Sequence, residues 1–146
     1  MKKRHLLLLC CAALLLLASA CGKNSGGGSM VTLKDLTHHR FVLVSVNGKD
    51  FSGHENIPSL EFGEGLHITG AVCNRFMGQG QLKGNILTVD HMASTRMLCA
   101  DQELNELETN FARMLAAGAE LELVGPELVV RQGDTVLRYT LADWVN

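Results

Sequence analysis

The segment RFVLVSVNG, residues 40–48, decides the fold class of this chain. Phe41 and three valines dominate its first seven positions, and such aromatic and β-branched side chains favour a strand. Asn47-Gly48 then follows, the dipeptide most typical of a two-residue hairpin. The segment therefore predicts an antiparallel sheet whose other strands lie further along the chain.

Short strands and tight turns recur through the rest of the sequence. Turns are predicted at Gly84-Asn85, Gly125-Pro126 and Gly133-Asp134. The further predicted strands are Ser59–Phe62, His67–Val72, Gln79–Lys83, Ile86–Asp90, Glu120–Leu123, Leu128–Arg131 and Thr135–Leu141. Such short links favour antiparallel pairing, and closure into a barrel-like sheet would remove exposed strand edges.

One long helix is predicted between the strands, over Asp101–Ala117. Asp101 is suited to cap its N-terminus, and Gly118 to end it in a left-handed conformation. Apolar side chains at helical spacing predict one buried stripe, formed by Leu104, Leu107, Phe111, Met114 and Leu115. This helix is expected to pack on the sheet.

A shorter helix is predicted over Leu33–His38, where Thr32 and Asp35 form a variant capping box. The complete set of elements indicates a mostly β, or α+β, fold. We expect a single small domain, a curved and barrel-like antiparallel sheet with one packed helix.

The first residues have the layout of a bacterial export signal. Residues 1–21 read MKKRHLLLLCCAALLLLASAC, a basic start, an apolar stretch and small residues before Cys21. The last five letters are similar to a lipoprotein signal, which is cut before a cysteine that is then acylated. Residues 22–29 form a Gly/Ser-rich tether. We expect a signal peptide over 1–20, a lipidated Cys21 with a linker to residue 31, and a folded domain over 32–146.

Two alternatives stay open for this N-terminus. Ala18 stands where lipoprotein signals usually have leucine, and ordinary cleavage after Ala20 would leave Cys21 as a free thiol. A transmembrane anchor is the weaker alternative, because the uncharged run Leu6–Gly22 has 17 residues and crossing a bilayer needs about 20.

Charge argues against nucleic acid as a partner. The 146-residue chain has a formal charge of −2, but removing Lys2, Lys3 and Arg4 with the signal leaves 10 basic and 15 acidic side chains, a charge of −5. Nucleic-acid binding depends on clustered Lys and Arg that displace phosphate counterions. We expect a mildly acidic domain that is monomeric and binds no nucleic acid.

Cys73 and Cys99 are the cysteines that remain after export and lipidation. In an oxidising compartment a lone pair is most simply a disulfide, here closing a loop over residues 74–98. Free buried thiols, a metal site and a redox pair stay open as alternatives, although neither cysteine lies in a CxxC motif.

Two unusual segments lie beside these cysteines, GAVCNRFMGQG at 70–80 and MASTRMLC at 92–99. A structural explanation is a bulged strand pair that the disulfide ties to the start of the helix. A functional explanation is a binding cluster that holds an anion or a peptide carboxylate through guanidinium groups. The members of that candidate cluster are Asn74, Arg75, Phe76, Thr95 and Arg96.

No catalytic or metal-binding motif stands out in the sequence. The histidines lack the i, i+2 or i, i+4 spacing that places two ligands on one face, and no serine lies in a Gly-x-Ser-x-Gly elbow. We expect no metal, no cofactor and no catalytic residue.

The motifs CNRF beside a Gly-rich strand, TRMLCA before an acidic helix start, and a final Leu-Ala-Asp together resemble the META domain family of bacterial envelope lipoproteins. The resemblance runs from about Leu33 to Asn146. It implies a META-type sheet with a packed helix, attachment to the periplasmic face of the outer membrane of a Gram-negative bacterium, and a role in heat stress and novobiocin tolerance. No catalytic site is established for the family.

Three functions follow as hypotheses. The first is a non-enzymatic envelope lipoprotein that binds an unidentified periplasmic partner through an apolar or mixed patch near residues 73–78 and 94–98. The second is a small-ligand carrier, which needs an interior not filled by Phe41, Leu43, Ile68 and Leu87. The third is an inhibitor of a periplasmic protease or cell-wall hydrolase, which needs an exposed, rigid loop at Asn74–Gln79.

Overall fold

A computed structural model describes residues 29–144 of the chain. The predicted signal peptide, Cys21 and most of the predicted linker lie outside these residues, so those assignments stay predictions. The helices are α1 (Leu33–Leu36) and α2 (Gln102–Ala117), with a 3₁₀ turn η1 (Glu64–Leu66). The strands are β1 (His39–Val46), β2 (Lys49–Asp50), β3 (Ser59–Phe62), β4 (His67–Ala71), β5 (Arg75–Lys83), β6 (Ile86–Ser94), β7 (Ala119–Val124), β8 (Glu127–Gln132) and β9 (Thr135–Trp144).

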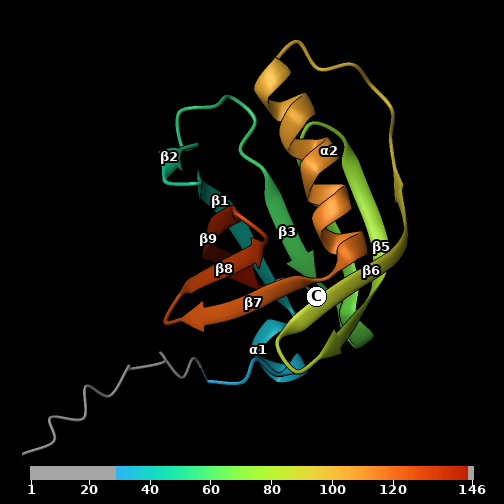
Figure 1. Cartoon of the computed structure of the whole chain (residues 1–146), viewed down its shortest axis with the longest axis vertical. Coiled ribbons are helices and arrows are strands. Elements are labelled where there is room, and N and C mark those ends of the chain that lie inside the picture. Colours follow the sequence, from blue (N-terminus) through green and yellow to red (C-terminus); the bar gives the residue numbers. More distant parts are fainter. Residues whose placement is uncertain (1–28, 145–146) are drawn as a thin grey trace, which may run out of the picture.

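The sheet closes on itself because β1 pairs with β3 on one side and with β9 on the other. Every pairing in it is antiparallel, and the neighbours follow the order of the sequence from β3 to β9. Strand β2 adds only a two-residue extension at the end of β1. The result is the barrel-like antiparallel sheet that the strand spacing predicts (Figure 1).

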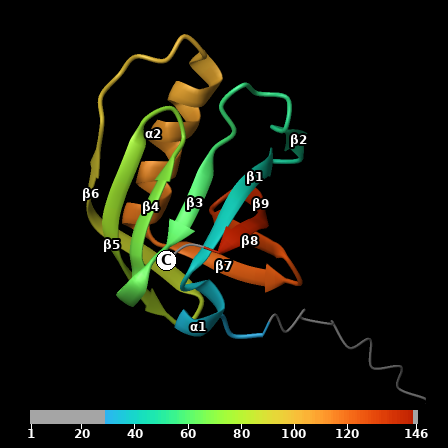
Figure 2. The same ribbon diagram turned by 180° about the vertical axis from the view of Figure 1, so that it is seen from behind.

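Helix α2 connects β6 to β7, the neighbours with the shortest pairing in the closed part of the sheet. Strands β6 and β7 share only the pairs Ile86 with Glu120 and Leu87 with Ala119, and α2 is the connection between these two strands. Figures 1 and 2 show the helix running along the wall formed by β4, β5 and β6. Its predicted apolar stripe is buried, and Phe111 lies 5.3 Å from Phe76 of β5 between ring centroids.

Side chains fill the interior of the sheet. Phe41, Leu43, Ile68 and Leu87 are each at most 2% exposed and belong to one core cluster with the helix stripe. In the part of the chain that the structure describes, the barrel therefore holds a packed core where the carrier hypothesis needs a ligand cavity.

Three of the four helix ends predicted from the sequence are confirmed, namely both ends of α2 and the start of α1. Asp101 caps α2 by accepting bonds from the N–H of Glu103 (2.9 Å) and Leu104 (3.3 Å), and Gly118 ends it at φ +99°. Asp35 accepts the N–H of Thr32 at 2.9 Å in the capping box of α1. The predicted end of α1 at His38 is wrong.

Helix α1 stops at Leu36 because Thr37 leaves the helical region at ψ 137°. His38 then takes φ +66°, and its N–H donates to the Phe62 carbonyl of β3 at 2.7 Å. The helix therefore ends two residues before its predicted end, because the backbone of His38 already bonds the sheet.

The largest differences from the predicted strands are in β5 and β6. Strand β5 begins at Arg75 rather than Gln79, and β6 continues to Ser94 rather than Asp90. Gly78 permits close packing inside the sheet, since a Cβ there would lie 2.5 Å from Cγ1 of Val89, which agrees with the predicted bulged strand pair. A bulge between Met77 and Gln79 absorbs the irregularity.

Candidate functional site

The candidate cluster lies where β5 begins, next to the segment that leads from β6 to α2. We call this segment, Thr95–Ala100, the strap. Hydrogen bonds bring Asn74, Arg75 and Thr95 together here, and Arg96 follows Thr95 along the strap. Arg75, Thr95 and Arg96 are exposed. Phe76 does not join them, because its side chain is 4% exposed and packs inward on Phe111.

The rigid, exposed loop that the inhibitor hypothesis needs at Asn74–Gln79 does not exist, so that hypothesis is wrong for this loop. Residues from Arg75 onward form β5, and both Asn74 and Phe76 are buried. The exposed segment beside the cysteines is the strap instead.

Asn74 is the hub of the cluster, although its side chain is only 7% exposed. Its Oδ1 accepts the N–H of Met97 at 2.7 Å and the Thr95 hydroxyl at 3.1 Å. Its Nδ2 donates to the Met97 carbonyl at 3.0 Å and to Oε2 of Glu108 at 3.1 Å. The amide therefore holds the strap and helix α2 at the same point.

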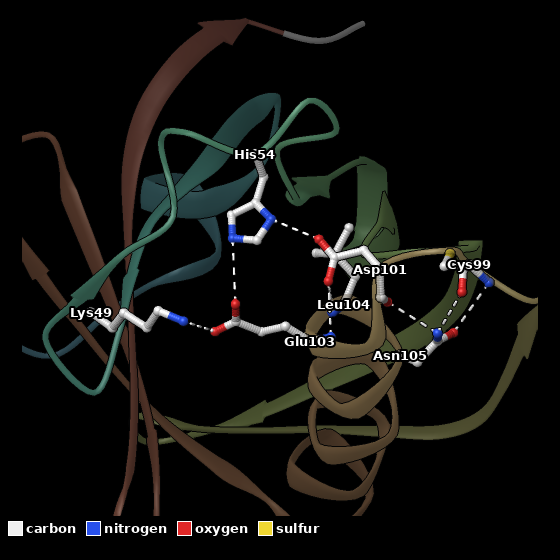
Figure 3. Close-up of polar contacts among 7 residues, drawn as sticks. All are labelled: Lys49, His54, Cys99, Asp101, Glu103, Leu104 and Asn105. Carbon is white, nitrogen blue, oxygen red and sulfur yellow. Dashed lines mark hydrogen bonds and ion pairs between the residues drawn. The ribbon is translucent and has the colours of Figure 1, made fainter.

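Alternate residues of the strap are fastened to the domain. The Thr95 N–H donates to the Arg75 carbonyl at 3.0 Å, and Met97 is held by Asn74. Cys99 is held by Asn105 of α2, which accepts its N–H at 3.3 Å and donates to its carbonyl at 2.9 Å (Figure 3). The strap is thus fixed at every second residue, by a backbone bond at Thr95 and by side-chain amides at Met97 and Cys99.

Cys73 and Cys99 are joined by a disulfide with a Cα–Cα distance of 6.0 Å, an ordinary span for this bond. Of the alternatives that the sequence leaves open, the structure has the cross-link. The bond ties the C-terminal end of the strap to the residue that precedes Asn74.

A second polar group at the N-terminus of α2 was not found from the sequence. His54, in the loop between β2 and β3, lies 2.9 Å from Asp101 through Nδ1 and 3.7 Å from Glu103 through Nε2 (Figure 3). Its ring stacks on Phe51 at 4.3 Å, and Lys49 pairs with Glu103 at 2.7 Å. No short-range pattern could link residue 54 to residue 101, because the fold alone brings them together.

These contacts favour the charged form of Asp101. Partial burial opposes that form, but bonds from the Leu104 N–H, His54 and the Glu103 N–H outweigh it and lower the pKa of Asp101 below its ordinary value. The loop before β3 is therefore attached to the helix end next to the strap.

A surface groove of about 830 Å³ runs beside the strap, over the outer face of β3, β4 and β5. Four residues of the candidate cluster line it, together with Met77 and Met97. Gly70 also lies on its lining, and no side chain fits at this position, because a Cβ there would lie 2.2 Å from the Ser59 carbonyl oxygen. Arg40 and Glu61 form an ion pair on its lining at 3.2 Å.

Exposed apolar side chains gather around this groove and strap. Met77 is 54% exposed, Met97 70% and Leu98 94%. Such a concentration on a fastened segment differs from the scattered apolar residues that soluble surfaces normally carry.

Among residues 29–144, no three His, Cys, Asp or Glu side chains are grouped as a metal site requires. No helix in this range has both the length and the apolar character needed to cross a membrane.

The family model described as the META domain matches residues 34–144 of this sequence. The chain belongs to the META domain family. It is 45% identical over 116 residues to Heat shock protein HslJ of Escherichia coli (strain K12). The aligned segment covers 80% of this chain and 83% of that protein.

Two solved NMR structures share the fold of this META domain. One is 46% identical, with a TM-score of 0.73, over 78% of this chain and 97% of the other. The second, a protein from Burkholderia xenovorans, is 18% identical, with a TM-score of 0.60, over 75% of this chain and 86% of the other. At this identity the similarity supports the fold alone.

Proposed function

We propose that this META-domain protein is a non-enzymatic lipoprotein of the bacterial envelope, anchored through Cys21, that binds a periplasmic protein through the strap. The observation that carries the proposal is the exposure of Met97 and Leu98 on a segment whose backbone is held by Asn74 and Asn105. An apolar anchor on an ordered backbone loses little conformational entropy when it binds.

The position of the strap fits a tethered protein. The chain enters the domain at α1, at the opposite end of the molecule from the strap and the start of α2 (Figures 1 and 2). A domain anchored on its N-terminal side would present the strap away from its membrane, toward proteins in the periplasm.

A role in heat stress and in tolerance of novobiocin belongs to the same proposal. The name of the E. coli relative, a heat shock protein, supports the first part. Survival of a deletion strain at elevated temperature and in novobiocin, each compared with the complemented strain, tests both parts.

Two experiments test the anchor and the binding surface. Cys21→Ser should move the protein from the membrane fraction to the soluble periplasmic fraction, and retention in the membrane would contradict a lipid anchor. In capture experiments on envelope extract, the double variant Met97→Ser/Leu98→Ser should lose bound proteins that the unaltered chain retains. Val124→Ser is the matched control, because Val124 is 57% exposed on β7, outside the strap and groove. Equal capture by all three chains would contradict the strap as the binding surface.

A further inference from the structure

Arg96 and Leu98 alternate along the strap with the residues that fasten it. Within residues 29–144, no hydrogen bond engages the backbone of either residue, whereas Met97 and Cys99 have both backbone groups bonded. The backbone groups of Arg96 and Leu98 are therefore available to a second chain, as the groups of an exposed strand edge are. Leu98, at 94% exposure, adds an apolar side chain that a partner could enclose.

The substrate cleft of an endopeptidase recognises available backbone groups at alternate residues together with an exposed apolar side chain. Such a cleft pairs with alternate residues of an extended segment, and its primary pocket takes the side chain that precedes the bond to be cut. With Leu98 in an apolar primary pocket, the backbones of Leu98 and Arg96 are the ones that pair. The bond presented to the protease is then Leu98–Cys99.

Both sides of that bond are held by the domain. On the Leu98 side, the preceding carbonyl of Met97 accepts from Nδ2 of Asn74 at 3.0 Å. On the other side, Asn105 accepts the Cys99 N–H at 3.3 Å and donates to its carbonyl at 2.9 Å. The disulfide to Cys73 adds a covalent restraint on Cys99.

We propose that the strap is the reactive loop of a protease inhibitor, and that the partner is a serine endopeptidase whose primary pocket accepts an apolar side chain at Leu98. The inference rests on the proposed partner binding and adds the chemical class of the partner.

The restraints explain why such a loop would inhibit the protease rather than serve as its substrate. The serine oxygen adds to the Leu98 carbonyl carbon, and the tetrahedral intermediate collapses as the C–N bond to Cys99 breaks. The protease histidine passes the serine proton to the departing nitrogen, which leaves an acyl-enzyme on Leu98 and a free amine on Cys99. Asn105 and the disulfide keep that amine beside the ester, so its attack re-forms the peptide bond and returns the proton to the histidine before water enters.

Chymotrypsin and subtilisin, which accept large apolar residues, are suitable probes, with trypsin as the protease of opposite preference. The purified, oxidised chain should inhibit chymotrypsin or subtilisin at a 1:1 ratio. Leu98→Lys should weaken this inhibition by about a hundredfold or more and create inhibition of trypsin, because the pocket residue sets specificity. Val124→Lys adds the same charge on β7, outside the strap and groove, and should leave both activities as in the unaltered chain.

Asn105→Ala tests the restraint itself. It should convert the inhibitor into a substrate, with cleavage at Leu98–Cys99 visible by mass spectrometry after reduction. Rapid cleavage of the unaltered chain, or no inhibition by it of either apolar-specific protease, would overturn the inference. If strap variants still abolish capture from envelope extract in that case, the proposed partner binding stands and only the protease assignment falls. If the unaltered chain inhibits neither protease and the strap variants also leave capture unchanged, the protease assignment and the proposed partner binding are both overturned.

Discussion

The side-chain amide of Asn74 bonds both backbone groups of Met97, accepting its N–H at 2.7 Å and donating to its carbonyl at 3.0 Å. A buried side chain thus imitates a strand partner for one residue of an exposed segment. The same amide bonds Glu108 on α2, so the strap, β5 and the helix meet at one residue.

Asn74→Ala should lower the free energy of unfolding by about 2 kcal/mol, because several hydrogen bonds are lost and Glu108 loses its partner. Urea denaturation followed by circular dichroism measures this change. Asn110→Ala is the matched control, since Asn110 is exposed on α2 and its substitution should change stability by less than about 0.5 kcal/mol. Equal effects of the two substitutions would show that the Asn74 bonds contribute nothing.

The disulfide between Cys73 and Cys99 leads us to expect non-additive losses of stability when both cysteines are replaced. Cys73→Ser and Cys99→Ser should each lower stability by about 3 kcal/mol, the chain-entropy value for a loop of this length. The double variant should be no less stable than either single one, because both remove the same bond. Additive losses would be inconsistent with a cross-link between the two residues.

Gly70 is required by close packing in the sheet. A Cβ there would lie 2.2 Å from the Ser59 carbonyl oxygen and 2.6 Å from Cζ of Phe76, so Gly70→Ala should destabilise the fold by about 3 kcal/mol. Gly53→Ala is the control, because nothing lies within 4 Å of its added methyl group. Thermal melting of both variants decides the point, and a Gly70→Ala chain as stable as the Gly53→Ala chain would refute the packing argument.

The lowered pKa of Asp101 predicts that the stability of the fold decreases as the pH falls. Its pKa is lower in the folded chain than its ordinary value, so its charge stabilises the fold above the unfolded-state pKa. That contribution is lost as the pH falls through the folded-state pKa. Asp101→Asn keeps a good N-cap but removes the charge, so it should destabilise the chain at pH 7 and have little effect near about pH 2.

Denaturation of both chains at the two pH values tests this prediction. A stability difference between Asp101→Asn and the unaltered chain that stays constant with pH would exclude the charge as its source.

Local patterns in the sequence predicted most of the fold. Asn47-Gly48 and Gly133-Asp134 turn where expected, because their short-range chemistry is sufficient to set a hairpin. The caps of α2 at Asp101 and Gly118 are local in the same sense. The start of β5 and the end of β6 were missed, because a bulge at Gly78, where the backbone packs against Val89 of the neighbouring strand, interrupts the regular alternation.

The site was predictable only in part for the same reason. Two unusual segments drew attention to Asn74 and Thr95, which do bond each other. The inward turn of Phe76 depends on Phe111, and the His54 contact with Asp101 depends on a loop placed by the closed sheet. Neither relationship leaves a periodic signal in the sequence.

Amide hydrogen exchange along the strap tests the central claim most directly, since the account requires a backbone fixed at alternate residues. The amides of Met97 and Cys99 should be protected, whereas those of Arg96 and Leu98 should exchange at rates close to those of an unfolded peptide. In Asn74→Ala, protection of Met97 should be lost while that of Cys99 persists through Asn105. Equal exchange at all four amides of the unaltered chain would contradict a fastened strap.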